Sequence, residues 1–543
     1  MKNKAEKERS RAKEKIFFLE IFIYYDIIIN TAIIQNISSN YKKMSLVKKI
    51  AYNTLTQIAG KIASTILGLF SLALITRYLG PQGFGEYTTV LTFLGFFAVF
   101  ADFGLTLVTV QLISDKRRDE GKVLNNLFAF RLLSVLIFLG AAPLIAVFLP
   151  YSTATKTGLI IAMAAFVFPA LNQIIVGLFQ KRLCMEKNAI AETVGKLILL
   201  AGILLGEKFN LGLTGILLAT SFGAFVSFIL HYLFSLKFAV IKLEWDFSLW
   251  KEVIIKFWPL AFTVILNLIY LRADTLLLSF FKSAEEVGFY GAPYKIIDVL
   301  TSLPFMFAGL ILPILSAAWL EKKSENFQNV LQRSLDLMVI IALPIIIGSQ
   351  FVAKETMLLA AGSEFSASSV ILKILIFSLL AIFPGTIFAH AVIAIDKQKK
   401  MIPFYIFTSI SSLLAYLILI PKFSYFGAAA VTIYSEITIS AFSAYCVLKY
   451  SNFKFSLKKM KRALLASLIM GLFLYFSRTF WQINIGELSV IAILKFALTI
   501  IVAAGIYLVF LLILKGVKKD DLLMIIKKQK DGGGQSFGSS TGI

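Results

Sequence analysis

Four basic residues lie well inside long apolar stretches and have no acidic residue three or four positions away. They are Lys61, Arg131, Arg272 and Lys373. An ionisable group at the centre of a bilayer costs about 2.5–3.5 kcal/mol on insertion scales, so it usually faces a cavity or a charged partner. Because Lys and Arg neutralise anions through charge-assisted hydrogen bonds, we expect these residues to bind an anionic ligand. The alternatives are that each snorkels to an interface or pairs with a carboxylate on a neighbouring helix, namely Asp102, Asp274 or Glu436.

Two of these carboxylates suggest a second kind of site. Asp102 and Asp274 could bind a coupling cation or a proton, as intramembrane carboxylates often do in transporters. A fixed ion pair is an equally good interpretation of both. His390 could titrate near neutral pH, but a lone histidine six residues after Pro384 is typical of a packed helix.

Three further basic residues have a carboxylate one helical turn away. The pairs are Glu192 with Lys196, Lys295 with Asp298, and Arg333 with Asp336. Residues at these spacings share one face of a helix. We therefore expect local salt bridges and rank these residues below the first four as ligand contacts.

The residues for several other chemistries are missing. Cys184 and Cys446 are the two cysteines, both near the predicted cytoplasmic side, where a disulfide is disfavoured. Gly60-Lys61 and Gly195-Lys196 are followed by Ile and Leu within apolar runs, so neither is a phosphate-binding loop. We expect no metal site, no ATP motor and no catalytic centre, and no cofactor beyond a coupling cation or proton.

The elements that position these residues are membrane-spanning helices. The mean hydropathy is +0.82, and 58% of the residues are hydrophobic, well outside the range of a soluble domain. A helix crosses the hydrocarbon with about 20 apolar residues, and the runs are too long for alternating barrel strands. The predicted spans are 51–76, 87–112, 123–149, 157–179, 189–206, 211–236, 253–281, 287–319, 327–350, 366–392, 401–420, 424–448, 463–480 and 488–514.

The sequence pattern of the first part of the chain is repeated about two hundred residues later. LALITRYLGPQGFGEYTTV, from Leu72, aligns with TLLLSFFKSAEEVGFYGAP, from Thr275, at an offset of 203, which places Gly85 on Gly288 and Tyr87 on Tyr290. Further blocks align in the same order at offsets of 201 and about 212, and the latter places Thr220 on Thr432. This pattern indicates a duplicated transporter.

Charge asymmetry predicts the orientation. The net charge of +23 does not point to nucleic acid, because the basic residues gather in alternate loops such as Lys116–Lys122 and Lys454–Arg462. By the positive-inside rule these loops and both termini are cytoplasmic. Six spans precede the second repeat, so both repeats enter the membrane in the same direction, and their axis runs along the membrane normal.

The chain divides into six segments by these criteria. They are an N-terminal extension of uncertain status (1–43), a six-helix lobe (44–240), an interfacial linker (241–252), a second six-helix lobe (253–450), two additional spans (451–515) and a cytoplasmic tail with a disordered end (516–543). The predicted fold class is an all-α membrane protein of about 14 helices, with two six-helix lobes related by a pseudo-two-fold axis along the membrane normal and two extra C-terminal helices.

Several motifs carry a family resemblance. RYLGPQGFGEY, its echo VGFYGAPYK, the LFQKRL loop and IPKFSYFGAAAVTIYSE resemble the Wzx-type polysaccharide flippases, over about Met44 to Leu514. These belong to the superfamily of multidrug, oligosaccharidyl-lipid and polysaccharide exporters. The resemblance implies that the chain moves a polyprenyl-diphosphate-linked oligosaccharide to the outer leaflet by alternating access. It makes the four basic residues candidates for binding the diphosphate, above all Arg131 and Arg272. It also implies glycosyltransferases and a polysaccharide polymerase as partners.

Two other functions remain open. A cation-coupled multidrug exporter of the same superfamily should have an acidic or aromatic cavity, whereas the unpaired intramembrane charges here lean basic. A membrane-embedded polysaccharide polymerase or ligase should have a large, polar extracytoplasmic loop. The longest predicted outer loop, about Phe351 to Phe365, is short.

Overall fold

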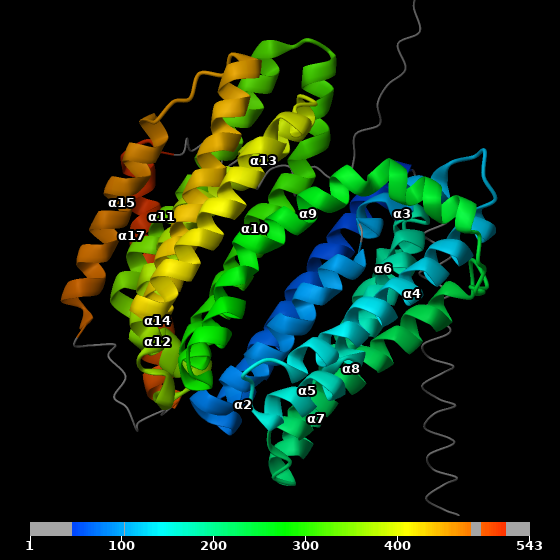
Figure 1. The fold of residues 1–543 in the computed structure, drawn as a ribbon. Helices are drawn as coiled ribbons and strands as arrows, with labels where there is room; N and C mark the ends of the chain where they lie inside the picture. Colours follow the sequence, from blue (N-terminus) through cyan, green and yellow to red (C-terminus); the bar gives the residue numbers. More distant parts are fainter. Residues whose placement is uncertain (1–45, 103, 479–489, 517–543) are drawn as a thin grey trace, which may run out of the picture.

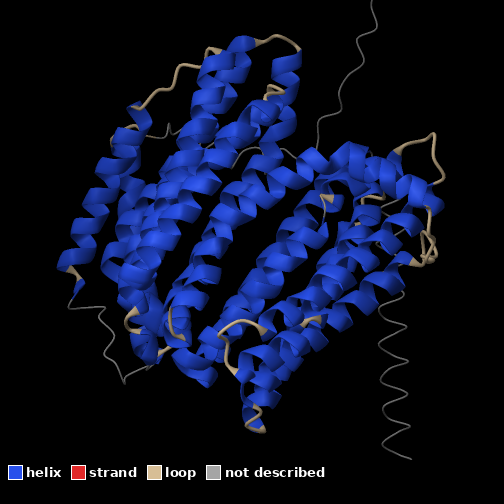
Figure 2. Cartoon of the chain, viewed as in Figure 1, coloured by secondary structure: helices blue, strands red, loops and turns tan. Residues whose placement is uncertain are grey.

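The computed structural model describes residues 46–102, 104–478 and 490–516. All regular elements within these ranges are helices (Figure 2). They are α2 (Leu46–Asp102), α3 (Leu105–Ser114), α4 (Glu120–Val147), α5 (Thr153–Ala162), α6 (Ala164–Lys181), α7 (Met185–Lys208), α8 (Gly212–Ser235), α9 (Phe247–Phe281), α10 (Ala284–Leu320), α11 (Ser324–Ala361), the short 3-10 turn η1 (Ser363–Phe365), α12 (Ser368–Leu375), the 3-10 turn η2 (Ile376–Ser378), α13 (Leu379–Ala394), α14 (Gln398–Ser451), α15 (Lys458–Phe476) and α17 (Val490–Ile513).

The helices coincide with the predicted apolar spans. Eleven of them within the described ranges are long and apolar enough to cross a membrane, and the longest two such stretches, Thr56–Asp102 and Gln398–Ser451, have 47 and 54 residues. Each is long enough for two crossings, since one needs about 20 residues. Each is also broken once, at Gly80 with φ 63° and at Ser424 with φ 51°. The all-helical membrane fold is therefore confirmed, whereas the division into twelve spans plus two stays a prediction.

The described helices form two bundles (Figure 1). One contains α2 to α8, and the other contains most of α9 together with α10 to α17. The bundles meet where α2 bends at Gly80 and packs on α10, and they diverge towards the end that carries α3. The predicted extension (1–43) lies outside the described residues, as does the predicted tail apart from Gly516.

The contact between the bundles involves equivalent residues of the two predicted repeats, each facing the counterpart of the other's partner. A Cβ added at Gly85 would collide with the Ala284 carbonyl oxygen, and one added at Gly288 would collide with the Pro81 carbonyl oxygen. Pro81 and Ala284 are themselves paired at the offset of 203. Because mutual contacts of this kind arise where a two-fold axis passes between equivalent surfaces, they support the predicted pseudo-symmetry. They also require glycine at both positions.

The linker between the bundles is attached to the first one. The Asn126 side-chain oxygen accepts a hydrogen bond from the backbone N–H of Asp246 at 2.6 Å, and the Trp250 indole donates to the Asn126 carbonyl at 3.1 Å. The indole is buried and lies 5.2 Å from the Phe130 ring. Asp246 caps α9 by accepting from the N–H groups of Ser248 and Leu249, and these bonds, with the ion pair to Lys122, lower the pKa of Asp246. The first turns of α9 therefore pack with the first bundle.

Candidate functional site

A cavity of about 460 Å³ lies between the two bundles. Three lysines line it, two from the first bundle (Lys61 on α2, Lys196 on α7) and one from the second (Lys295 on α10). Asp298 is the one carboxylate among the described residues of this lining. Because Lys295 belongs to the other bundle, closing or opening the bundles changes its distance from Lys61 and Lys196.

A second cavity of about 300 Å³ adjoins the first and shares Lys61 and Lys196 with it. It lies within the first bundle. The buried His231 ring lies between two oxygen atoms there, with Nδ1 2.7 Å from the Ser227 carbonyl and Nε2 2.9 Å from the Asn188 side-chain oxygen. Asn188 in turn donates to Glu192 at 3.2 Å. This hydrogen-bonded chain orients Glu192 beside the lysines.

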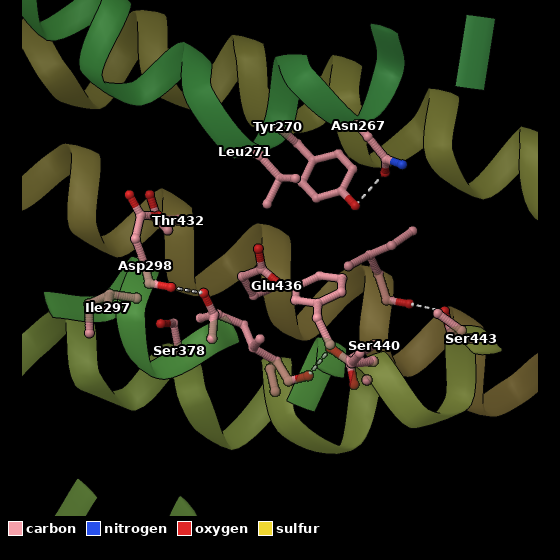
Figure 3. Close-up of a pocket in the computed structure, with 18 of the residues that line it drawn as sticks. Asn267, Tyr270, Leu271, Ile297, Asp298, Ser378, Thr432, Glu436, Ser440 and Ser443 are labelled. Atoms are coloured by element: carbon pink, nitrogen blue, oxygen red, sulfur yellow. Dashed lines mark hydrogen bonds between the residues drawn. The ribbon is translucent and has the colours of Figure 1, made fainter. Parts of the chain in front are cut away.

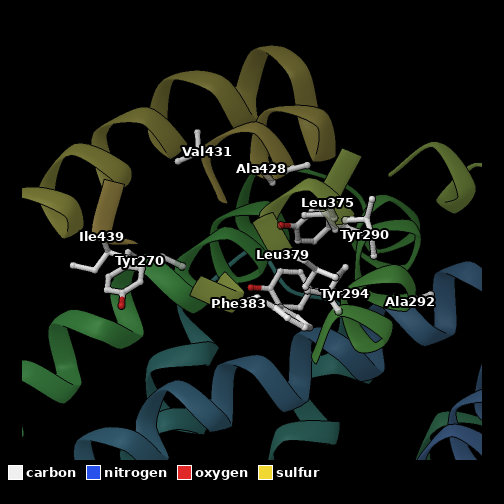
Figure 4. Packing of buried hydrophobic residues seen from close by; sticks show 14 of the residues in the cluster. Tyr270, Tyr290, Ala292, Tyr294, Leu375, Leu379, Phe383, Ala428, Val431 and Ile439 are labelled. Carbon is white, nitrogen blue, oxygen red and sulfur yellow. The ribbon is translucent and has the colours of Figure 1, made fainter. Parts of the chain in front are cut away.

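A third cavity of about 330 Å³ lies within the second bundle (Figure 3). It is bounded by α9, α10, α13 and α14, and Asp298 belongs to both its wall and that of the inter-bundle cavity. Arg272 lies in this wall, pairs with Asp298 at 3.0 Å and stacks on Tyr294 at 5.2 Å. Tyr294 also lines this cavity, and it belongs with Tyr290 and Phe383 to the apolar core (Figure 4).

Positive charge prevails in the inter-bundle cavity. Lys196 lies within electrostatic range of both Lys61 and Lys295, and Asp298 is already paired with Arg272. Like charges repel at such distances, so a cluster of this kind is stabilised when an anion binds between its members. The cavity can therefore bind a ligand that carries more than one negative charge.

Two of the four predicted ligand contacts line the described cavities. Lys61 lies in the inter-bundle cavity and Arg272 in the third one. Arg131 lines none of the three cavities described above. It is 1% exposed, forms an ion pair with Asp102 and donates to Thr106 at 3.0 Å. Arg131 therefore pairs with a carboxylate on a neighbouring helix, which was the alternative to ligand binding. Its partner, Asp102, lies at the end of α2, and Arg131 has no acidic residue one turn away on its own helix.

Lys373 and the two candidate coupling carboxylates lie elsewhere. Lys373 is on the amphipathic α12 and lines none of the three cavities described above. Asp102 is occupied by Arg131. Asp274 is fully buried and accepts hydrogen bonds from the Tyr290 hydroxyl at 2.6 Å and the Thr432 hydroxyl at 3.1 Å, with no cation within 4.0 Å among the described residues. Of these two carboxylates, Asp274 is the one without an ion pair among the described residues.

The three local salt bridges expected from helical spacing are wrong. In each case the carboxylate has a different partner: Glu192 is hydrogen-bonded to Asn188, Asp298 pairs with Arg272, and Asp336 pairs with Lys459. Residues one turn apart on a helix are neighbours, but a side chain from another helix can meet the carboxylate more directly. Lys196 and Lys295 are thereby left facing the cavity.

One sequence signal could have identified Lys295 as a cavity residue. On α10, Gly288, Gly291, Lys295 and Asp298 recur at intervals of three or four residues and so share one face. A Cβ added at either glycine would contact the first bundle, which identifies that face as the one between the bundles. His390, interpreted above as a packing residue, also lines a cavity, the third one, with Nδ1 2.8 Å from the Thr386 carbonyl.

The end at which the bundles meet is closed by polar contacts as well as by the glycines. Arg77 on α2 donates to the carbonyls of Leu358 and Leu359 at the end of α11, at 3.0 and 2.8 Å. The Tyr151 and Ser279 hydroxyls are 2.9 Å apart, and burial raises the pKa of Tyr151 to about 12. These contacts join the two bundles on one side of the cavity.

Two bundles of membrane-length helices that enclose a basic cavity define a two-lobed membrane transporter. The chain belongs to the polysaccharide biosynthesis protein family, whose profile matches residues 46–319. It is 22% identical over 387 residues to the capsular polysaccharide biosynthesis protein CapF of Staphylococcus aureus, covering 70% of this chain and 94% of that one. It is 23% identical over 376 residues to a putative O-antigen transporter of Shigella flexneri, covering 66% and 86%.

Solved structures share the fold. The lipid II flippase MurJ in an inward closed conformation is similar with a TM-score of 0.69 and 19% identity, covering 83% of this chain and 98% of that one. A multidrug resistance transporter of the MATE family in an inward-facing conformation is similar with a TM-score of 0.60 and 14% identity, covering 74% and 98%. At these identities the likeness extends to the architecture alone.

Proposed function

We propose that this protein is a flippase that carries polyprenyl-diphosphate-linked oligosaccharides from the inner to the outer leaflet of the cytoplasmic membrane. The observation that carries the proposal is the convergence of Lys61, Lys196 and Lys295 in the cavity between the lobes. A diphosphate that links a lipid to a sugar keeps a negative charge on each phosphate, which three ammonium groups can neutralise. The names of the capsular polysaccharide and O-antigen relatives support this cargo.

The cargo crosses by alternating access. The lobes meet at the end of Gly85 and Gly288 and diverge at the end of the α3–α4 loop. If the basic loops are cytoplasmic, this state is open to the cytoplasm, where glycosyltransferases would supply the cargo. Rocking of the lobes would then release it outside to a polysaccharide polymerase. A drug exporter is less well supported, because lysines in the inter-lobe cavity would repel a cationic drug.

The proposed orientation has a direct test. We expect the Lys116–Lys122 loop and both termini to be cytoplasmic. Lys116 is exposed in the α3–α4 loop, so the substitution Lys116→Cys, in a chain whose Cys184 and Cys446 are serine, should leave the fold unchanged. An impermeant thiol reagent should label this cysteine in inside-out vesicles and spare it in intact cells. Efficient labelling in intact cells would reverse the topology.

Transport is expected to depend on an ion gradient or the membrane potential and to need no ATP. Asp274 is the proposed coupling carboxylate, because its charge is buried among neutral hydroxyl donors. In sealed vesicles loaded with lipid-linked oligosaccharide, transfer of this lipid between leaflets should stop when ionophores collapse the gradients. In Asp274→Asn, which keeps the shape and removes the charge, the remaining transfer should no longer respond to ionophores. Transfer that required ATP in the absence of any gradient would refute this proposal.

A further inference from the structure

The cavity within the second lobe offers several hydrogen-bond acceptors. Hydroxyl protons of its lining are donated to backbone carbonyls of their own helices, by Thr301 at 3.0 Å, Thr386 at 2.7 Å and Ser443 at 2.9 Å. Their oxygen lone pairs remain available to a ligand. His390 lines the same cavity, and its Nδ1 lies 2.8 Å from the Thr386 carbonyl, to which it donates.

One charged group in this cavity lacks a partner. Glu436 is 8% exposed, lines the cavity (Figure 3), and forms no hydrogen bond or ion pair with the residues that the structure describes. Arg272, the one Lys or Arg among the described lining residues, is already paired with Asp298. A buried carboxylate without a donor is costly. A ligand that supplies donors at Glu436 removes this cost.

The position of this cavity relative to the lysines restricts the ligand. Asp298 lies in the wall of both cavities, so the two cavities adjoin at this residue. A group attached directly to a ligand at Lys295 is therefore close to the second-lobe cavity. The aromatic residues Tyr270 and Tyr294 lie in this wall and offer ring faces to an apolar surface. A pyranose combines such C–H surfaces with several hydroxyl donors, and the cavity volume of about 330 Å³ leaves room for a sugar residue.

We propose that the second-lobe cavity binds the sugar residue next to the diphosphate, and that Glu436 selects neutral or amino sugars against acidic ones. The proposal rests on the flippase function. A sugar hydroxyl or ammonium group donates to Glu436, whereas a uronic acid carboxylate in the same place meets a second carboxylate and no free cation. Like charges in a buried site disfavour binding strongly. Glu436 is thus a specificity residue for the first sugar.

The test compares lipid diphosphates that differ only in the sugar. Three probes of equal chain length carry no sugar, one glucose or one glucuronic acid, and binding is measured on the full chain in nanodiscs. We expect the wild type to bind the glucose probe at least about tenfold more tightly than the glucuronate probe, the scale of one charge-assisted hydrogen bond. In Glu436→Gln, which preserves shape, this ratio should fall to about threefold or less, and the affinity for the sugar-free probe should not change.

Controls separate this inference from the flippase function. The double variant Lys196→Ala, Lys295→Ala should weaken the binding of all three probes equally. If it weakens the binding of none of them, the flippase proposal fails. If the lysines matter but Glu436→Gln leaves the glucose-to-glucuronate ratio unchanged, the sugar site is refuted. Two further results would also overturn it: a dependence of glucose-probe binding on Na⁺ that vanishes in Glu436→Gln, or tight binding of tetraphenylphosphonium that vanishes in the same variant. They would make Glu436 a cation site or a drug site.

Discussion

Replacing both Lys196 and Lys295 with alanine is expected to reduce polysaccharide export by about a hundredfold or more. Each ammonium lines the cavity between the lobes and lacks an ion pair among the described residues. A hydrogen bond to a charged group is worth about 1.5–3 kcal/mol, and two such bonds multiply their effects to about a hundredfold at least. The measurement is surface polysaccharide in cells that depend on this protein, at matched protein level in the membrane.

Lys373→Ala is the matched control. Lys373 is also a lysine within an apolar span, but it lines none of the three cavities described above, so export should stay near the wild-type level. Replacement of Lys196 or Lys295 by Arg should preserve much of the export if charge dominates, and less of it if the compact ammonium is needed. Near-normal export by the double alanine variant would show that the cargo charge is bound elsewhere.

Gly85→Ala is expected to prevent the lobes from closing at the end where they meet. An added Cβ would collide with the Ala284 carbonyl, which is backbone and cannot move aside as a side chain can. Overpacking of this kind costs about 1–3 kcal/mol, which shifts a two-state equilibrium by about five- to a hundredfold. The variant should therefore populate states open at this end and transport poorly.

Cysteine accessibility measures this shift. Ser302 lines the inter-lobe cavity, so Ser302→Cys in a cysteine-free background reports when the cavity is open to the outside. Impermeant reagent should label it slowly in intact cells and several-fold faster when Gly85→Ala is added. Gly140→Ala is the control, because no atom lies within 4 Å of a Cβ built there. Equal labelling of the three proteins would mean that the glycine contact does not set the closed state.

The helical membrane fold could be predicted because apolar spans and internal repeats are visible in the sequence itself, without knowledge of how the helices pack. Length and hydropathy suffice to place helices in a bilayer. The repeat alignment paired Gly85 with Gly288, but their contact between the bundles was not predicted. The docking of Trp250 on the first lobe was not predicted, because it depends on the Asn126 carbonyl more than a hundred residues away.

The charged residues were harder to place, since pairing is decided between helices. Asp298 was assigned to Lys295 on its own helix, but it pairs with Arg272 on α9. Arg131 looked unpaired because Asp102 lies 29 residues away along the chain. Spacing within one helix shows which residues are neighbours and not which face meets another helix. Arg272, Asp298, His390 and Glu436 line the second-lobe cavity and were conspicuous in the sequence, but nothing in their spacing showed that they share one cavity.

The most direct test of the central claim is leaflet transfer by the purified protein. Proteoliposomes are loaded with a fluorescent lipid-linked oligosaccharide or with a fluorescent cationic drug, an ion gradient is imposed without ATP, and an impermeant quencher follows each cargo. The account predicts that the lipid-linked oligosaccharide changes leaflet, that the Lys196→Ala, Lys295→Ala protein fails to move it, and that the drug stays inside. Export of the drug, with no movement of the lipid-linked oligosaccharide, would contradict the account.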